Sequence, residues 1–142
     1  MNESNIWLIY AILSAFFAAL TTIFAKVGVQ GVNSNLATAI RTVIILAIAW
    51  GLVYTEGTFR ELFELNRKTL LFLVLSGMAT GLSWLCYFRA LQLGSASLVA
   101  PVDKSSLLLI ALLSVMFLGE PLTIKMIIGT GLILLGTLVL IR

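Results

Sequence analysis

Charged side chains inside long apolar runs are the residues of this sequence that could do chemistry. Asp103 and Lys104 lie about five residues into the apolar run 98–118, and Arg41 lies at a similar depth in the run 36–54. If these runs cross a bilayer, each charge costs about 2.5–3.5 kcal/mol on insertion scales and calls for a reason. A carboxylate at this depth can carry a proton, and the cations can attract an anionic or zwitterionic solute.

Two interpretations of these three charges stay open. In the first, Arg41, Asp103 and Lys104 line a polar vestibule for such a solute, and Asp103 is the embedded carboxylate available for proton coupling. In the second, Asp103 pairs with Arg41 or Lys104 and joins two helices, while Lys104 extends toward the lipid headgroups. Lys26 and Arg89 are expected to end their own helices on the same side.

Pro101 precedes the Asp103–Lys104 pair in the same run. Proline has no backbone N–H, so it frees the carbonyl of Ser97 and loosens the surrounding helix. A helix weakened in this way can act as a hinge or coordinate a solute. Alternatively, Pro101 lies near the helix start, where proline is harmless.

The run 70–88 carries one polar and aromatic face. Its members are Ser76, Thr80, Trp84 and Tyr87, at spacings of four, four and three residues. Residues at such spacings lie on one side of a helix. The face could line a solute pathway, or Trp84 and Tyr87 could belong to an aromatic belt at the membrane surface.

Small residues recur in two of the runs. Gly77 and Gly81 form a Gly-x-x-x-Gly pair, and Gly129 and Gly136 repeat at seven residues, each followed by a threonine (Thr130 and Thr137). Small residues at helical spacing allow close helix contact. Both patterns predict packing, including packing between subunits, and not solute binding.

The composition excludes several classes of function. The sequence has no histidine and one cysteine, Cys86, so neither a metal-ligand cluster nor an intramolecular disulfide is expected. It also lacks a catalytic triad, a phosphate-cradling glycine loop and any cofactor motif. The net charge of +3 comes from scattered basic residues without interleaved aromatics, so no nucleic-acid partner is expected. We expect neither an enzyme nor a cofactor.

The elements that must position these residues are membrane helices. Of the 142 residues, 61% are hydrophobic and 11% charged, whereas soluble domains carry about 25% charged residues. Five apolar runs approach the ~20 residues that cross a bilayer. The runs span about 6–27, 36–54, 70–88, 98–118 and 124–141, with a possible interfacial helix over 58–66. We therefore predict a single all-α membrane domain over 1–142, a bundle of five transmembrane helices in contact with lipid.

The distribution of basic residues gives no clear orientation. Membrane proteins normally place the side richer in lysine and arginine in the cytoplasm. The expected sides carry Arg60, Arg67, Lys68 and Lys125 against Lys26, Arg41, Arg89, Arg142 and, if it is counted, Lys104. A chain without bias can insert both ways, and two opposed copies would form an inverted, antiparallel homodimer. Alternatively, a partner or the first helices fix a single orientation.

Three segments carry a pattern that is specific in its order and spacing. Residues 82–94 read LSWLCYFRALQLG and continue as SASLVAP to Pro101; FLGE ends the fourth run before Pro121; AFFAAL and FAK lie within 15–26. Together they resemble the EamA domain of the drug/metabolite transporter superfamily. Most members have two such domains, so this chain resembles the short single-domain branch of bacteria and archaea.

The resemblance implies a transporter or exporter of a small metabolite in a prokaryotic cytoplasmic membrane. With the inverted dimer, it predicts secondary transport by alternating access. Two alternatives stay open: a non-transporting scaffold or accessory subunit, and one half of an obligate heterodimeric transporter. The substrate does not follow from the motifs, because they are mostly architectural.

Overall fold

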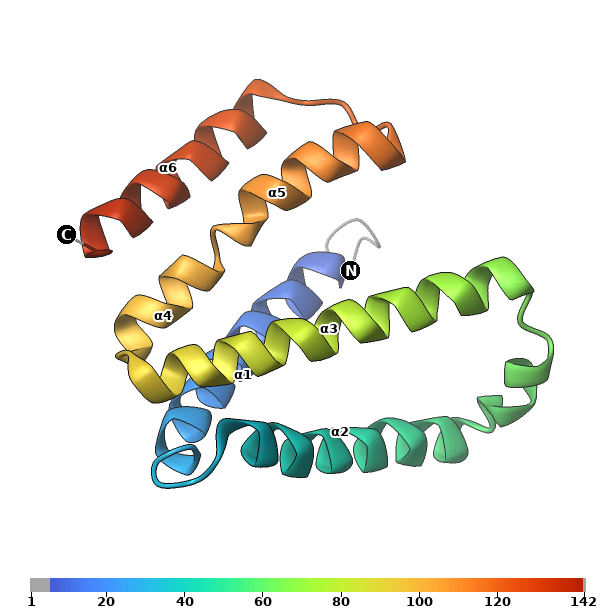
Figure 1. The fold of residues 1–142 in the computed structure, drawn as a ribbon. Coiled ribbons are helices and arrows are strands. Elements are labelled where there is room, and N and C mark those ends of the chain that lie inside the picture. The colour runs from blue at the N-terminus through green and yellow to red at the C-terminus, as the bar shows by residue number, and fades with distance from the viewer. Residues whose placement is uncertain (1–5, 142) are drawn as a thin grey trace. The chain divides into compact units, whose positions relative to one another are not determined.

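The protein is an all-α membrane protein, as the sequence predicts. The computed structural model describes residues 6–141, of which no residue lies in a strand; the chain is 87% helical (Figure 1). Five helical segments in this part of the chain are long and apolar enough to cross a bilayer. Arg142, one of the cations in the charge comparison, lies outside the described residues.

The helix bounds follow the apolar runs, with informative differences. The elements are α1 (Ile6–Gly28), α2 (Ser34–Glu56), η2 (Thr58–Phe63), α3 (Arg67–Leu93), α4 (Ala96–Asp103), α5 (Ser106–Leu113), η3 (Ser114–Leu118) and α6 (Ile124–Ile141). The segment expected as an interfacial helix over 58–66 is a short 3₁₀ helix, η2. Helix α3 runs to Leu93, so Arg89 lies in its last turns and does not end it, contrary to the sequence prediction.

The helix ends are set by local polar chemistry. Asn33 caps α2, its side-chain oxygen accepting from two backbone N–H groups of the first turn. Asn66 and Thr123 accept backbone N–H groups at the starts of α3 and α6 in the same manner. Gly57 and Gly119 end α2 and η3 with φ values of 73° and 67°, where a side chain would be strained. Gly119 thus ends the fourth span, and Thr123 caps the start of α6.

The fourth spanning segment is broken, whereas the sequence predicts one continuous helix over 98–118. Helix α4 ends at Asp103, and α5 begins at Ser106 (Figure 1). Farther along, Ser114–Leu118 form a turn of π-helix before Gly119. Irregular backbone at membrane depth is tolerated where protein or water meets its polar groups.

The chain divides into two compact units, which we describe separately. The middle unit is Phe24–Gln92, and the terminal unit combines Met1–Ile23 with Leu93–Arg142. In the middle unit, the end of α1, the start of α2 and the end of α3 share a small core around Val29, Phe88 and Leu91. In the terminal unit, α6 packs against α4 and α5.

Most large apolar side chains of the described residues are exposed on the helix surfaces. Such exposure suits a lipid solvent, since lipid tails are as apolar as the side chains they meet. The four glycines predicted to pack have open space beside them: a Cβ built on Gly77, Gly81, Gly129 or Gly136 would meet none of the described atoms within 4 Å. Their close helix contact stays a prediction.

Candidate functional site

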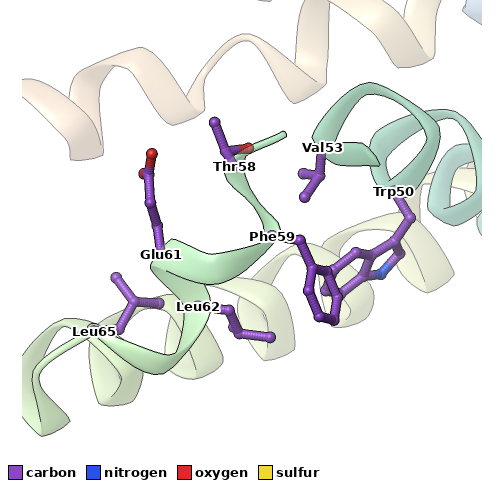
Figure 2. A pocket seen from close by; sticks show the side chains of 7 residues that line it. All are labelled: Trp50, Val53, Thr58, Phe59, Glu61, Leu62 and Leu65. Carbon is purple, nitrogen blue, oxygen red and sulfur yellow. The ribbon is translucent and has the colours of Figure 1, made fainter. Parts of the chain in front are cut away.

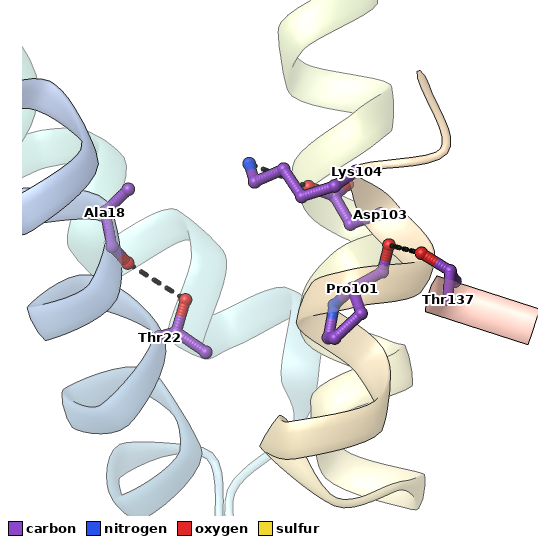
Figure 3. A network of polar contacts seen from close by, with 6 residues as sticks. All are labelled: Ala18, Thr22, Pro101, Asp103, Lys104 and Thr137. Carbon is purple, nitrogen blue, oxygen red and sulfur yellow. Dashed lines mark hydrogen bonds and ion pairs between the residues drawn. The ribbon is translucent and has the colours of Figure 1, made fainter. Parts of the chain in front are cut away.

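The break between α4 and α5 is the candidate site of the terminal unit. In a continuous helix the Ser105 N–H would bond to the carbonyl of Pro101, but it donates to the Val102 carbonyl at 3.0 Å. The Pro101 carbonyl lies instead 3.3 Å from the hydroxyl of Thr137 on α6 (Figure 3). That hydroxyl also lies 2.9 Å from the Ile133 carbonyl, so its hydrogen is shared. Thr137 therefore supplies the donor that the break removes.

Pro101 lies inside α4, which decides between its two predicted positions. The helix begins at Ala96, with Ser95 before it, so the harmless first helical position is not where the proline is. Without an N–H, Pro101 leaves the Ser97 carbonyl without its helical donor. Helix α4 is thus weakened before Pro101 and interrupted after Asp103.

Asp103 and Lys104 meet at this break. The Lys104 ammonium lies 3.4 Å from the Asp103 carboxylate (Figure 3). Both side chains are partly exposed, at 38% for Asp103 and 58% for Lys104. The pair lies within one spanning segment, and a role of Asp103 in joining two helices stays a prediction. A carboxylate and an ammonium at an interrupted helix offer both an acceptor and donors to a solute.

Arg41 belongs to α2 in the middle unit, and its side chain contacts α3. Its guanidinium carbon sits 4.2 Å from the ring centre of the buried Phe88, a cation–π contact. The buried Nη1 of Arg41 has no hydrogen-bond acceptor among the described residues. A buried guanidinium nitrogen of this kind is costly and is available to an anionic group.

Arg41 and Asp103 lie equally deep along their helices. Each is the seventh residue after the first residue of its helix, Ser34 or Ala96. At 1.5 Å per residue, each lies about 10 Å along its helix. Because Arg41 belongs to the middle unit and the Asp103–Lys104 pair to the terminal unit, a common vestibule stays a prediction.

The predicted polar face of α3 is present, with unequal exposure along its length. Ser76 and Thr80 are exposed, and the Thr80 hydroxyl donates to the Ser76 carbonyl at 2.9 Å. Trp84 and Tyr87 are half-buried. A role of these side chains in a pathway or in an aromatic belt stays a prediction.

Polar contacts at the end of α3 are the feature that sequence reasoning missed. The Gln92 side-chain amide donates to the carbonyls of Val32 at 2.7 Å and Val29 at 3.2 Å, in the turn between α1 and α2. Arg89 donates to the Gln92 side-chain oxygen at 2.6 Å, and Lys26 donates to the Leu91 carbonyl at 2.6 Å. These contacts join three helix ends. In the sequence, the feature that could have indicated these contacts is the run Arg89–Gln92, which lies within the segment 82–94 that resembles the EamA domain.

Two hollows on the surface of the middle unit are lined by residues of the described range. One, of about 210 Å³, is lined by Trp50, Val53, Thr58, Phe59, Glu61, Leu62 and Leu65. In Figure 2 the Trp50 and Phe59 rings lie together, with centres 5.8 Å apart, while the Glu61 carboxylate is directed away from them. The other, of about 530 Å³, is lined by Asn33, Ser34, Asn35, Leu85, Cys86 and Arg89. No group of side chains able to hold a metal ion occurs among residues 6–141.

Comparisons with known proteins are consistent with these features. The model of the EamA-like transporter family matches residues 5–142. A Sinorhizobium sp. protein named as an uncharacterized transporter in the cobO 3′ region is 50% identical over 96% of this chain and 97% of its own length. An uncharacterized protein of Methanocaldococcus jannaschii is 28% identical over 94% of each chain. No solved structure matches the chain significantly.

Proposed function

Because this chain belongs to the EamA-like transporter family, we propose that it is a secondary transporter that carries a small metabolite by alternating access. The protein is an integral membrane protein, and its family is one of transporters rather than enzymes. The membrane we propose is the cytoplasmic membrane of a prokaryotic cell, since the two relatives come from a bacterium and an archaeon.

The interrupted fourth span carries this proposal. Binding sites of secondary transporters typically form where a membrane helix is discontinuous and its free backbone groups and charges face the solute. Here the interruption coincides with the Asp103–Lys104 pair, and Pro101 weakens the helix directly before it. A structure that only filled space in the membrane would gain nothing from such a break.

The proposed solute is anionic or zwitterionic, and Arg41, Asp103 and Lys104 are its proposed contacts. Arg41 supports this assignment because it lies as far along its helix as Asp103 does, and because its buried guanidinium nitrogen has no acceptor among residues 6–141. Asp103 is also the carboxylate that would carry a coupled proton. Trp84 and Tyr87 would line the same pathway from α3.

Alternating access by a five-helix chain calls for a second half, and we propose a second copy in the opposite orientation. The two relatives align with this chain over nearly their whole lengths, so they too are about as long as one five-helix unit. Inverted repeats related by an axis in the membrane plane are the common transporter architecture. Two antiparallel copies would reproduce it.

The proposal is tested in two stages with purified protein. First, thermal unfolding is measured against a panel of amino acids, organic acids, sugars and nucleosides. A solute at about 100 times its Kd stabilises the native state by about 2.7 kcal/mol, which raises the midpoint by several degrees. Second, uptake of each stabilising solute into proteoliposomes is measured with and without a proton gradient.

The Asp103→Asn variant shows whether the carboxylate at the break takes part in transport. We expect its free energy of unfolding to change by no more than about 0.5 kcal/mol, the usual range for a partly exposed charge. We also expect it to lose most of the uptake. Glu120→Gln, in the exposed loop after Gly119, is the matched control and should transport normally. Absence of uptake for every stabilising solute would favour the scaffold alternative, and equal uptake by both variants would remove Asp103 from the mechanism.

A further inference from the structure

The larger hollow of the middle unit lies where the start of α2 meets the last turns of α3. Three consecutive residues at the start of α2, Asn33–Asn35, form one part of its lining. The other part comes from Leu85, Cys86 and Arg89, which lie on one side of α3 because they are three or four residues apart. Its volume of about 530 Å³ falls within the range of small-molecule sites, about 300–1,000 Å³.

The charges around this hollow have one sign. Arg89 is the charged residue among the described residues that line it; Lys26 lies in the last turn of α1, and Arg41 lies seven residues after the start of α2. The carboxylates of the middle unit are Glu56, Glu61 and Glu64, all at or beyond the far end of α2, a helix of 23 residues. A span of that length separates them from the hollow by about 30 Å, several Debye lengths at physiological salt.

The hydrogen-bonding groups of the lining are mainly donors. Arg89 uses one nitrogen, Nη1, on Gln92, and its guanidinium has further N–H groups. The Asn33 side-chain oxygen is occupied as the cap of α2, so the amide N–H₂ is the group of this side chain that can bind a ligand. The first turn of α2 adds the partial positive charge of a helix N-terminus. Donors without a carboxylate suit an anion and not a cation.

We propose that this hollow binds a phosphate group, held by Arg89 and by Asn33 and Asn35 at the start of α2. The group is either the phosphodiester of an anionic lipid headgroup or a free phosphate. Both sources fit the position, because the hollow lies at the helix ends, where a span meets the headgroup region and water. Arginine binds phosphate through paired N–H groups, and a helix start adds to the attraction. Binding of a phosphate group in this hollow does not require that the protein transports a solute.

Cys86 allows a test on the unaltered protein. It is the single cysteine of the sequence, it is exposed, and it lines the hollow. Its labelling rate with the neutral reagent N-ethylmaleimide is measured by mass spectrometry in detergent. The additions are phosphatidylglycerol, phosphatidylcholine as the zwitterionic control, or inorganic phosphate. At about ten times its Kd, a ligand leaves about one-tenth of the sites free and slows labelling about tenfold.

The outcomes distinguish the two sources. Slowing by phosphatidylglycerol but not by phosphatidylcholine or inorganic phosphate assigns a lipid headgroup. Slowing by inorganic phosphate at millimolar concentration assigns a free anion. The proposal is overturned if none of the additions slows labelling, if phosphatidylcholine slows it equally, or if Cys86 does not react at all.

A variant pair ties the effect to the hollow. Arg89→Gln should remove most of the slowing, whereas Arg67→Gln, at the opposite end of the same helix, should keep it. If Arg89→Gln proves unstable, Asn35→Leu replaces it, because Asn35 lines the hollow and its side chain does not cap α2. Equal slowing in a folded variant and in Arg67→Gln would mean that the anion binds elsewhere.

Discussion

At the scale of single residues, the hydroxyl of Thr137 is the group whose role is most sharply defined. Thr137 is buried, and its hydroxyl lies 3.3 Å from the Pro101 carbonyl that the break leaves without a helical partner. Interhelical hydrogen bonds in membranes contribute about 0.6–2 kcal/mol. Thr137→Val keeps the side-chain shape and removes the donor, so we expect a loss of stability in that range.

The measurement is thermal unfolding of the purified variant in detergent. Thr130→Val, two turns earlier on α6, is the matched control and should change the midpoint little. Thr137→Ser restores a hydroxyl and should recover most of the loss. A Thr137→Val midpoint equal to that of Thr130→Val would show that the Pro101 carbonyl finds another donor.

Gln92 supports a second prediction at this scale. Its amide satisfies two carbonyls of the turn between α1 and α2, and its oxygen accepts from Arg89. Gln92→Leu leaves both carbonyls without this donor and should cost about 1–3 kcal/mol for each that stays unsatisfied. Guanidinium or thermal unfolding would measure the loss. Gln30→Leu, an exposed position in the same turn, should be nearly neutral.

The contacts of Thr137 and Gln92 could not be predicted from the sequence. Arg41, Asp103 and Lys104 attract attention because charge inside an apolar run is costly whatever it contacts. The partners of Thr137 and Gln92 lie 36 and about 60 residues away, and no local spacing brings them together. Thr137 belongs to a small-residue repeat that predicts packing, yet its hydroxyl makes a specific contact.

At the scale of elements, the fourth span is interrupted near Pro101 but not at Pro101 itself. Pro101 directly affects the carbonyl four residues before it, Ser97, whereas the helix is interrupted after Asp103. Run length alone predicts the five spans, because lipid demands about 20 apolar residues per crossing. It does not predict an interruption, since residues 104 and 105 fall within an otherwise apolar run.

Replacing the proline tests whether the break is needed for function. Pro101→Ala restores a donor to the Ser97 carbonyl and removes a residue that costs a helix interior about 3 kcal/mol. We expect an unchanged or higher unfolding midpoint, slower hydrogen exchange of residues 97–108, and reduced uptake of the transported solute. Pro121→Ala is the control, because this second proline lies outside the helices. Full uptake by a Pro101→Ala variant with slowed exchange would contradict a hinge at this position.

At the scale of the whole molecule, each of the two compact units leaves helix faces free of contact within that unit. Five apolar spans are present, but within the described residues the buried side chains are few and lie near helix ends or around the break. The glycines at 77, 81, 129 and 136 have open space beside them among the described residues. Small residues on a lipid-facing surface permit close approach of another helix. A second copy is therefore the partner we propose for these faces.

The orientation of the two copies is tested by cysteine tags at opposite ends of α2. Gln30→Cys and Glu64→Cys, each with Cys86→Ser, lie before and after this span and are exposed. Gly57 is avoided, since its φ of 73° disfavours a side chain. Neither substitution alters the balance of lysine and arginine that sets orientation. A membrane-impermeant maleimide is then added to intact cells and to lysed cells.

Dual insertion predicts that the reagent labels about half of each tagged protein in intact cells and all of it after lysis, because an unbiased chain inserts both ways. A single orientation predicts full labelling of one tag and none of the other. The comparison is internally controlled, since the two labelled fractions must sum to the whole in either case. Equal halves would make the antiparallel homodimer the working assembly. An all-or-none result would require a parallel pair or a different chain as the second half.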